Sequence, residues 1–162
     1  MKLATNKIKK ILKISEPFLM IDEFKIIKSG KSALGIKKIN MNEWFFKSHF
    51  TDDPTMPSTL ITEAMLQTNV LILYLKNKNN PNKIFITKSS VNNFNKINTE
   101  GEINIEANIE SEKNGMIKAK SEVFFNKKMV AKGVFNYIDP VFFNLKINKL
   151  WKQKSLNQKL YL

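Results

Sequence analysis

The chain has 162 residues and a formal net charge of +13, and every basic residue is a lysine. This length fits one domain with a real core, and a hydrophobic content of 43% excludes a disordered chain. No apolar run reaches the roughly 18 residues that span a bilayer, and the N-terminus lacks the apolar segment of a signal peptide. The absence of cysteine excludes disulfides and thiolate metal sites, and we expect a cytoplasmic protein.

The positive charge favours polyanionic partners. Nucleic acid is disfavoured, because base readout and phosphate clamping rely on arginine, and because the lysines are scattered along the chain. An acidic protein partner fits the charge at least as well. A codon bias towards Lys and Asn would produce the same composition without any function.

The first half of the chain predicts a short helix, a hairpin and a long helix. Apolar spacing indicates an amphipathic helix over residues 5–14, and two β-rich runs, 18–27 and 32–41, flank a turn centred on Gly30. An irregular stretch follows. Residues 57–76 then begin with a proline suited to a first helical turn, and they are apolar on nearly all sides, which predicts a core helix wrapped by protein.

The second half predicts four antiparallel strands, with turns at Asn114-Gly115 and at residues 126–128. They cover residues 83–90, 102–111, 116–125 and 129–138. The economical packing is an α+β fold in which a curved antiparallel sheet wraps around the long helix. Residues 1–139 form this domain. Residues 140–162 form a basic and apolar extension, which we expect to be helical and to dock on the domain; a partner-binding arm and a membrane-interface segment are the alternatives.

The only histidine, His49, stands just before the long helix, and Glu63 lies near the beginning of that helix. A lone histidine or glutamate is usually structural or solvated. However, an ionised carboxylate in an apolar stretch is costly without a partner or a raised pKa. The nearby helix N-terminus favours a developing negative charge. The segment therefore combines a base, a carboxyl group and an anion-stabilising helix end.

Residues 45–67 resemble the signature of the 3-hydroxyacyl-(acyl-carrier-protein) dehydratases of the FabZ family, and the similarity extends over residues 8–139. Upstream, residues 17–22 are similar to the family's Pro-Phe-Leu-Leu-Val-Asp. The matching motifs are Phe45-Phe46, His49-Phe50, Met56-Pro57 and Glu63-Ala64-Met65.

The resemblance implies a hot-dog fold whose sheets pair edge to edge in a homodimer, often built into a trimer of dimers (a homohexamer). It implies an active site that takes His49 from one subunit and Glu63 from the other, with no metal and no cofactor. His49 would be the base and Glu63 the acid that dehydrates a (3R)-3-hydroxyacyl thioester carried by acyl carrier protein. The backbone N–H of Ser58 would bind the thioester oxygen. Acyl carrier proteins are acidic, so they would also account for the lysine excess.

The sequence departs from the family's pattern at residues 51–53, Thr-Asp-Asp in place of Pro-Gly-His, and at Ser58, which replaces a glycine. These changes leave open a specialised dehydratase, a hot-dog thioesterase or isomerase, and a non-catalytic protein that binds an acyl carrier. We also expect several apolar side chains to line an acyl tunnel. The candidates are Leu66, Val70, Leu73, Tyr74, Phe85 and Phe94.

Overall fold

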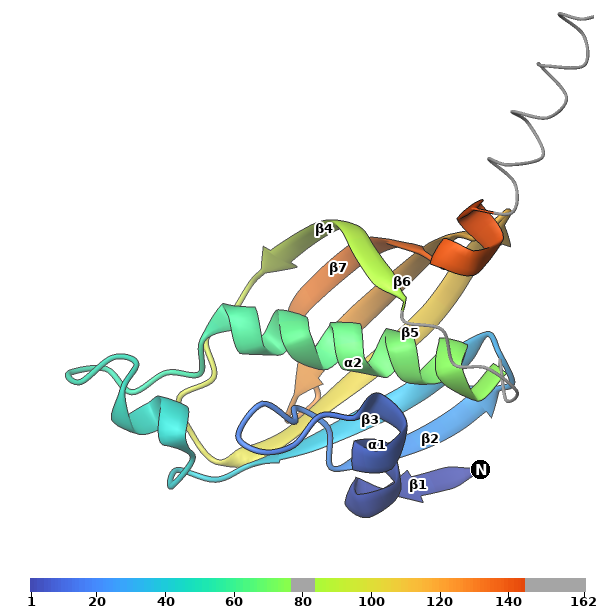
Figure 1. The fold of residues 1–162 in the computed structure, drawn as a ribbon. Coiled ribbons are helices and arrows are strands. Elements are labelled where there is room, and N and C mark those ends of the chain that lie inside the picture. Colours follow the sequence, from blue (N-terminus) through green and yellow to red (C-terminus); the bar gives the residue numbers. More distant parts are fainter. Residues whose placement is uncertain (77–83, 145–162) are drawn as a thin grey trace, which may run out of the picture.

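The computed structural model describes residues 1–76 and 84–144, in which a curved sheet wraps one side of a long helix (Figure 1). In chain order the elements are β1 (Lys2–Ala4), α1 (Thr5–Leu12), β2 (Glu23–Lys28), β3 (Ser32–Ile39), the 3-10 helix η1 (Trp44–Lys47), α2 (Ser58–Lys76), β4 (Phe85–Asn93), β5 (Gly101–Lys113), β6 (Met116–Phe125) and β7 (Lys128–Ile138). The predicted α+β class and the four C-terminal strands are confirmed.

All strand pairs are antiparallel, in the order β1-β2-β3-β5-β6-β7-β4. The chain leaves the sheet after β3, forms α2 across its concave face, and returns as the edge strand β4 (Figure 1). Alternating buried and exposed residues in β5 and β6 show that one face of these strands packs on the core. The three predicted hairpin turns are present, with positive φ at Gly30, at Asn114 and Gly115, and at Asn126 and Lys127.

The helix α2 is the centre of the core, as its apolar sequence predicts. Ala64, Met65, Leu71 and Leu73 are buried along it. Helix and sheet pack closely at Gly35 of β3, where an added Cβ would lie 2.5 Å from Oγ1 of Thr68. Only a glycine allows this distance, so the helix is held directly against the middle of the sheet.

The predicted strand from residue 18 is wrong for residues 18–22, because β2 begins only at Glu23. The backbone of Phe18 and Met20 bonds to a side chain of α2, and the Asp22 N–H already reaches the Ile36 carbonyl of β3 (2.7 Å). The Gln67 carboxamide donates to the Phe18 carbonyl (2.8 Å) and accepts from the Met20 N–H (2.9 Å). The sequence also gave no signal for β1, which has only three residues.

After β7, a helical segment begins at Pro140. Asp139 precedes it and accepts a hydrogen bond from the Val141 N–H (3.0 Å), as an N-cap residue does. The predicted boundary at residues 139/140 stays a prediction, and residues 145–162 of the predicted extension lie outside the described residues. Within the described ranges, no helix combines the length and hydrophobicity needed to cross a membrane.

Candidate active site

His49 lies in a tightly bonded loop between η1 and α2. Its backbone N–H donates to the Phe45 carbonyl (2.9 Å), and its carbonyl accepts from the Thr55 N–H (2.7 Å). The imidazole Nδ1 lies 3.0 Å from the Thr55 carbonyl oxygen. A carbonyl can only accept, so Nδ1 carries the proton in this bond, and in a neutral imidazole the lone pair is then on Nε2. The hydrogen bond thus selects the tautomer that can remove a proton through Nε2.

An open pocket of about 440 Å³ lies beside this imidazole. It is lined by His49 and Phe50, by Ser58 and Ile61 in the first turn of α2, and by residues 93–96, at the end of β4 and just after it. The structure therefore brings His49 and Ser58 together at one pocket. Among the described residues no backbone carbonyl accepts a hydrogen bond from the Ser58 N–H, which agrees with its place at the start of a helix.

One of the departures at residues 51–53, Asp53, forms an ion pair with Lys96, which lines this pocket. Asp53 binds Lys96 with both carboxylate oxygens, at 2.8 and 2.6 Å from Nζ. This contact ties the loop after His49 to the segment after β4, and Lys96 offsets the charge that Asp53 adds. Because both side chains are about half exposed, the pair contributes little to stability.

Glu63 does not line this pocket, and within the described residues no hydrogen bond joins it to His49. Ile61, which does line it, is two residues away, which is about 200° around an α-helix. Glu63 therefore faces the other side of α2 from its own chain's His49. One chain alone does not assemble the predicted pair.

The Glu63 carboxyl is half-buried, and this burial raises its pKa above the usual value of 4.5. A hydrogen bond from Gln67 Nε2 to Glu63 Oε1 (2.8 Å) acts in the opposite direction, because it favours the ionised form. Burial is the larger effect. The carboxyl group therefore keeps its proton to a higher pH than an exposed glutamate, as a general acid requires.

Gln67 is the site residue that sequence reasoning missed. Its side chain joins Glu63 to the backbone of Phe18 and Met20, and so fixes the orientation of the carboxyl group. A signal was present: Gln67 is one helical turn after Glu63, in a stretch that is otherwise mostly apolar.

A second group of buried polar side chains is centred on Asn69, farther along α2. Asn69 and Ser121 are buried, and Asn69 donates to the Tyr137 hydroxyl (3.1 Å).

We expect Gln67→Met to raise the pKa of Glu63, because the variant keeps the burial and removes the hydrogen bond that stabilises the carboxylate. The measurement is the ¹³C chemical shift of the Glu63 carboxyl carbon as a function of pH. Thr62→Val is the control, since the Thr62 hydroxyl bonds only to the Ser58 carbonyl. An unchanged or lower Glu63 pKa in Gln67→Met would contradict this account of the carboxyl.

Of the predicted tunnel residues, Leu73 is buried in the core, Phe94 lines the His49 pocket, and Phe85 is exposed on β4. The tunnel itself stays a prediction.

Among the described residues, no three His, Asp or Glu side chains gather into a group that could hold a metal ion.

Comparison with known proteins decides the family. Residues 13–134 match the model of the FabA-like domain. The chain belongs to the FabA-like domain family. A 3-hydroxyacyl-(acyl-carrier-protein) dehydratase FabZ from Caldicellulosiruptor bescii is 33% identical over 129 residues, which are 79% of this chain and 92% of that protein. These matches confirm the predicted FabZ-type resemblance.

FabZ of Clostridium botulinum (strain Hall) is 42% identical over 74 residues, 46% of this chain. The match covers about half the length of that relative (51%). Among solved structures, a hypothetical thioesterase with coenzyme A from Streptococcus pneumoniae has a TM-score of 0.57 at 11% identity, covering 71% of this chain and 84% of that one. An HP0420-homologue from Helicobacter felis has a TM-score of 0.59 at 17% identity, covering 78% and 92%. These similarities confirm the predicted hot-dog fold.

Proposed function

We propose that this chain is a homodimeric dehydratase of (3R)-3-hydroxyacyl thioesters carried by acyl carrier protein. In each active site His49 of one chain meets Glu63 of the partner subunit. The observation that carries this proposal is the poised His49 imidazole in an open pocket, in a chain whose relatives are FabZ dehydratases. The proposed compartment is the cytoplasm, and assembly into a trimer of dimers stays a prediction.

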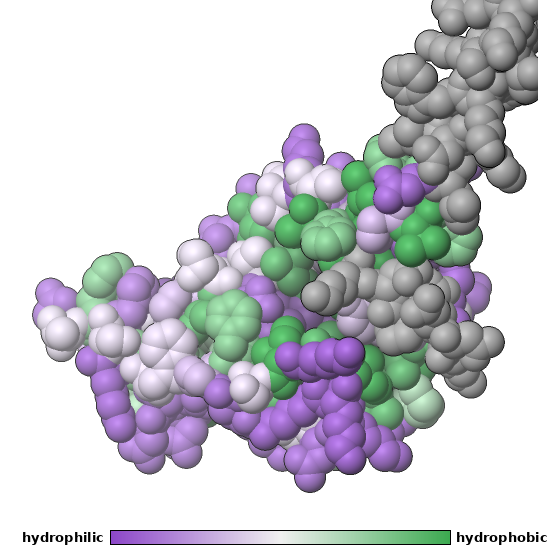
Figure 2. All heavy atoms as spheres, viewed as in Figure 1, coloured by the Kyte–Doolittle hydropathy of each residue, from purple (hydrophilic) through white to green (hydrophobic). Residues whose placement is uncertain are grey.

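The dimer is supported by the edge strand β4. It is nine residues long, and nearly all of its residues are exposed, on both faces of the strand. Its outer side has no partner strand among the described residues. Phe85 and Ile86 are exposed on it, and hydrophobic side chains gather on this part of the surface (Figure 2). A long free edge of this kind is normally covered or paired. Pairing of β4 with its copy would continue the sheet across the dimer.

The position of β4 relative to the pocket links the dimer to the chemistry. β4 ends at Asn93, and residues 93–96 form one wall of the His49 pocket. A copy that pairs along β4 therefore lies next to this pocket. Because Glu63 faces away from its own His49, the carboxyl that completes the site is supplied by the partner subunit.

In the reaction, His49 Nε2 removes the proton on the carbon next to the thioester carbonyl. The C–O bond at the third carbon breaks, and the hydroxyl leaves as water with the proton of Glu63 of the partner subunit. A carbon–carbon double bond forms between the two carbons. The negative charge that develops on the thioester oxygen is stabilised by the Ser58 N–H at the start of α2. The His49 proton passes to the Glu63 carboxylate through solvent, which restores both groups.

Acyl carrier protein is the proposed carrier because the chain has a net charge of +13 and such carriers are acidic. Opposite charges accelerate the encounter of two proteins, and salt weakens this effect. With an acyl-carrier substrate, kcat/KM should therefore fall as ionic strength rises.

The experiment supplies the native chain with a (3R)-3-hydroxybutyryl thioester and follows the absorbance of the conjugated enoyl product and the release of free thiol. We expect enoyl product without free thiol, and no product from the (3S) enantiomer. Free thiol without enoyl product would show a thioesterase instead. No turnover of either kind, with the substrate still bound, would show an acyl-carrier-binding protein.

A further inference from the structure

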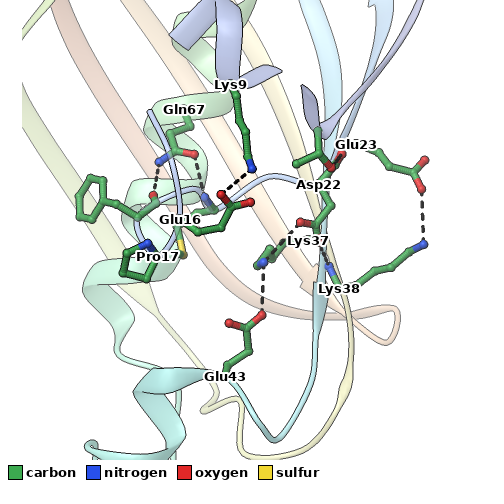
Figure 3. Close-up of polar contacts among 12 residues, drawn as sticks. Lys9, Glu16, Pro17, Asp22, Glu23, Lys37, Lys38, Glu43 and Gln67 are labelled. Atoms are coloured by element: carbon green, nitrogen blue, oxygen red, sulfur yellow. Dashed lines mark hydrogen bonds and ion pairs between the residues drawn. The ribbon is translucent and has the colours of Figure 1, made fainter. Parts of the chain in front are cut away.

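Residues 16–22 belong to the connection between α1 and β2 and are here called the strap; Figure 3 shows Glu16 and Pro17 of the strap close to Gln67 of α2. The strap is held by side chains from both sides. From α2, Gln67 binds the backbone of Phe18 and Met20. From η1, the Trp44 indole N–H donates to the Pro17 carbonyl (3.4 Å). The strap therefore contacts the helix of Glu63 and also η1, the short helix that precedes the loop of His49.

Lys37 of β3 adds a charged link between the same two parts. Its ammonium lies 3.4 Å from Oδ1 of Asp22, at the end of the strap, and 3.3 Å from Oε1 of Glu43, the residue before η1 (Figure 3). The second oxygen of Asp22 accepts the backbone N–H of Lys38 (2.8 Å). One ammonium group thus joins the strap to the beginning of the loop that leads to His49.

The Lys37 side chain is 10% exposed, and those of Asp22 and Glu43 are about a quarter exposed. A shielded cation between two carboxylates interacts more strongly than an exposed pair, and removal of the cation leaves two like charges facing each other. The neighbouring Lys38 is a natural contrast. Its side chain is 68% exposed and lies 3.6 Å from Glu23 only.

We propose that Lys37 is a positioning residue for the active site, an inference that rests on the proposed pairing of His49 with Glu63. Through Glu43 it holds the loop that presents His49. Through Asp22 it holds the strap, which orients Glu63 by way of Gln67. In the dimer these two groups belong to different active sites, so each strap supports one group in each of the two sites.

The test compares Lys37→Gln with Lys38→Gln, which removes the same charge from the adjacent residue. For Lys37→Gln we expect kcat for the hydroxybutyryl thioester to fall about tenfold to a hundredfold, with KM within threefold of the native value. Lys38→Gln should stay within twofold in both constants. A Lys37→Gln variant with native kcat, or equal losses in both variants, would overturn the proposal.

Hydrogen exchange of the native chain and both variants gives a readout that does not depend on turnover. Faster exchange in residues 17–22 and 43–49 of Lys37→Gln, with no change in Lys38→Gln, supports the link, and unchanged exchange in both overturns it. If the native chain has no dehydratase activity, the proposed function fails. The exchange rates still decide whether Lys37 joins the strap to the His49 loop.

Glu43→Gln provides a second variant in case Lys37→Gln does not fold. It weakens only the connection to the His49 loop, whereas Lys37→Gln also breaks the connection to the strap. We therefore expect a fall in kcat that is no larger than that of Lys37→Gln, with KM retained. The double variant should be no slower than Lys37→Gln alone, because Lys37→Gln already breaks the connection to Glu43. Losses that multiply would overturn the proposal, since they would show that the two residues act independently.

Discussion

His49→Ala is expected to lower kcat for a (3R)-3-hydroxyacyl thioester by about 10²- to 10⁴-fold, the usual contribution of a positioned general base. The reason is the hydrogen bond between Nδ1 and the Thr55 carbonyl, which selects the neutral tautomer whose Nε2 can accept a proton beside the pocket. The measurement is the initial rate of enoyl formation. His49 is only partly buried and its side chain bonds to one carbonyl, so its removal should leave the fold intact.

Added imidazole provides the control for this variant. If His49 acts as a base, imidazole should diffuse into the open pocket and restore part of the rate. Lys47→Ala, an exposed change two residues away, should keep the native rate. A His49→Ala protein that retains more than a tenth of the native kcat would contradict the assignment of His49 as the base.

Glu63→Gln is the second substitution with a large expected effect, a fall in kcat of about 10²- to 10⁴-fold. Glutamine has the same shape and can still accept the hydrogen bond from Gln67, but it has no acidic proton to give to the leaving hydroxyl. The loss should therefore appear in kcat, with little change in KM. The same enoyl assay measures both constants.

The stability of Glu63→Gln should not decrease together with its activity. Burial raises the pKa of Glu63, so the folded chain binds this proton more tightly than the unfolded chain. The free energy of unfolding of the native chain therefore decreases as pH rises from the unfolded-state pKa through the raised folded-state pKa. At neutral pH, Glu63→Gln should be as stable as the native chain or more stable. Lower stability together with lower activity would mean that Glu63 is structural.

The sequence was sufficient for the elements whose hydrophobic pattern is regular. The apolar run of α2 predicted the buried helix, and the alternation in β5, β6 and β7 predicted strands with one buried face. Residues 18–22 look equally strand-like, but the backbone of Phe18 and Met20 is bound by Gln67. A contact between residues 47 or 49 positions apart leaves no local pattern, so propensity alone could not reveal it.

The candidate site was predictable only in part for a related reason. The motif around His49 and Ser58 is local, and the structure brings these two residues to one pocket. Glu63 is also close in sequence, yet helix geometry turns it away from that pocket. The raised pKa of Glu63 was expected from its apolar surroundings, whereas the exposed edge of β4 becomes evident only when the order of the strands is known.

The most direct test of the shared active site uses heterodimers of the two inactive variants. His49→Ala and Glu63→Gln chains, produced together with different affinity tags, are isolated as mixed dimers and assayed for enoyl formation. One site of each mixed dimer then holds neither functional group, and the other holds both, so we predict about half of the native activity. Mixed dimers as inactive as the two parent variants would contradict the meeting of His49 with Glu63 of the partner subunit.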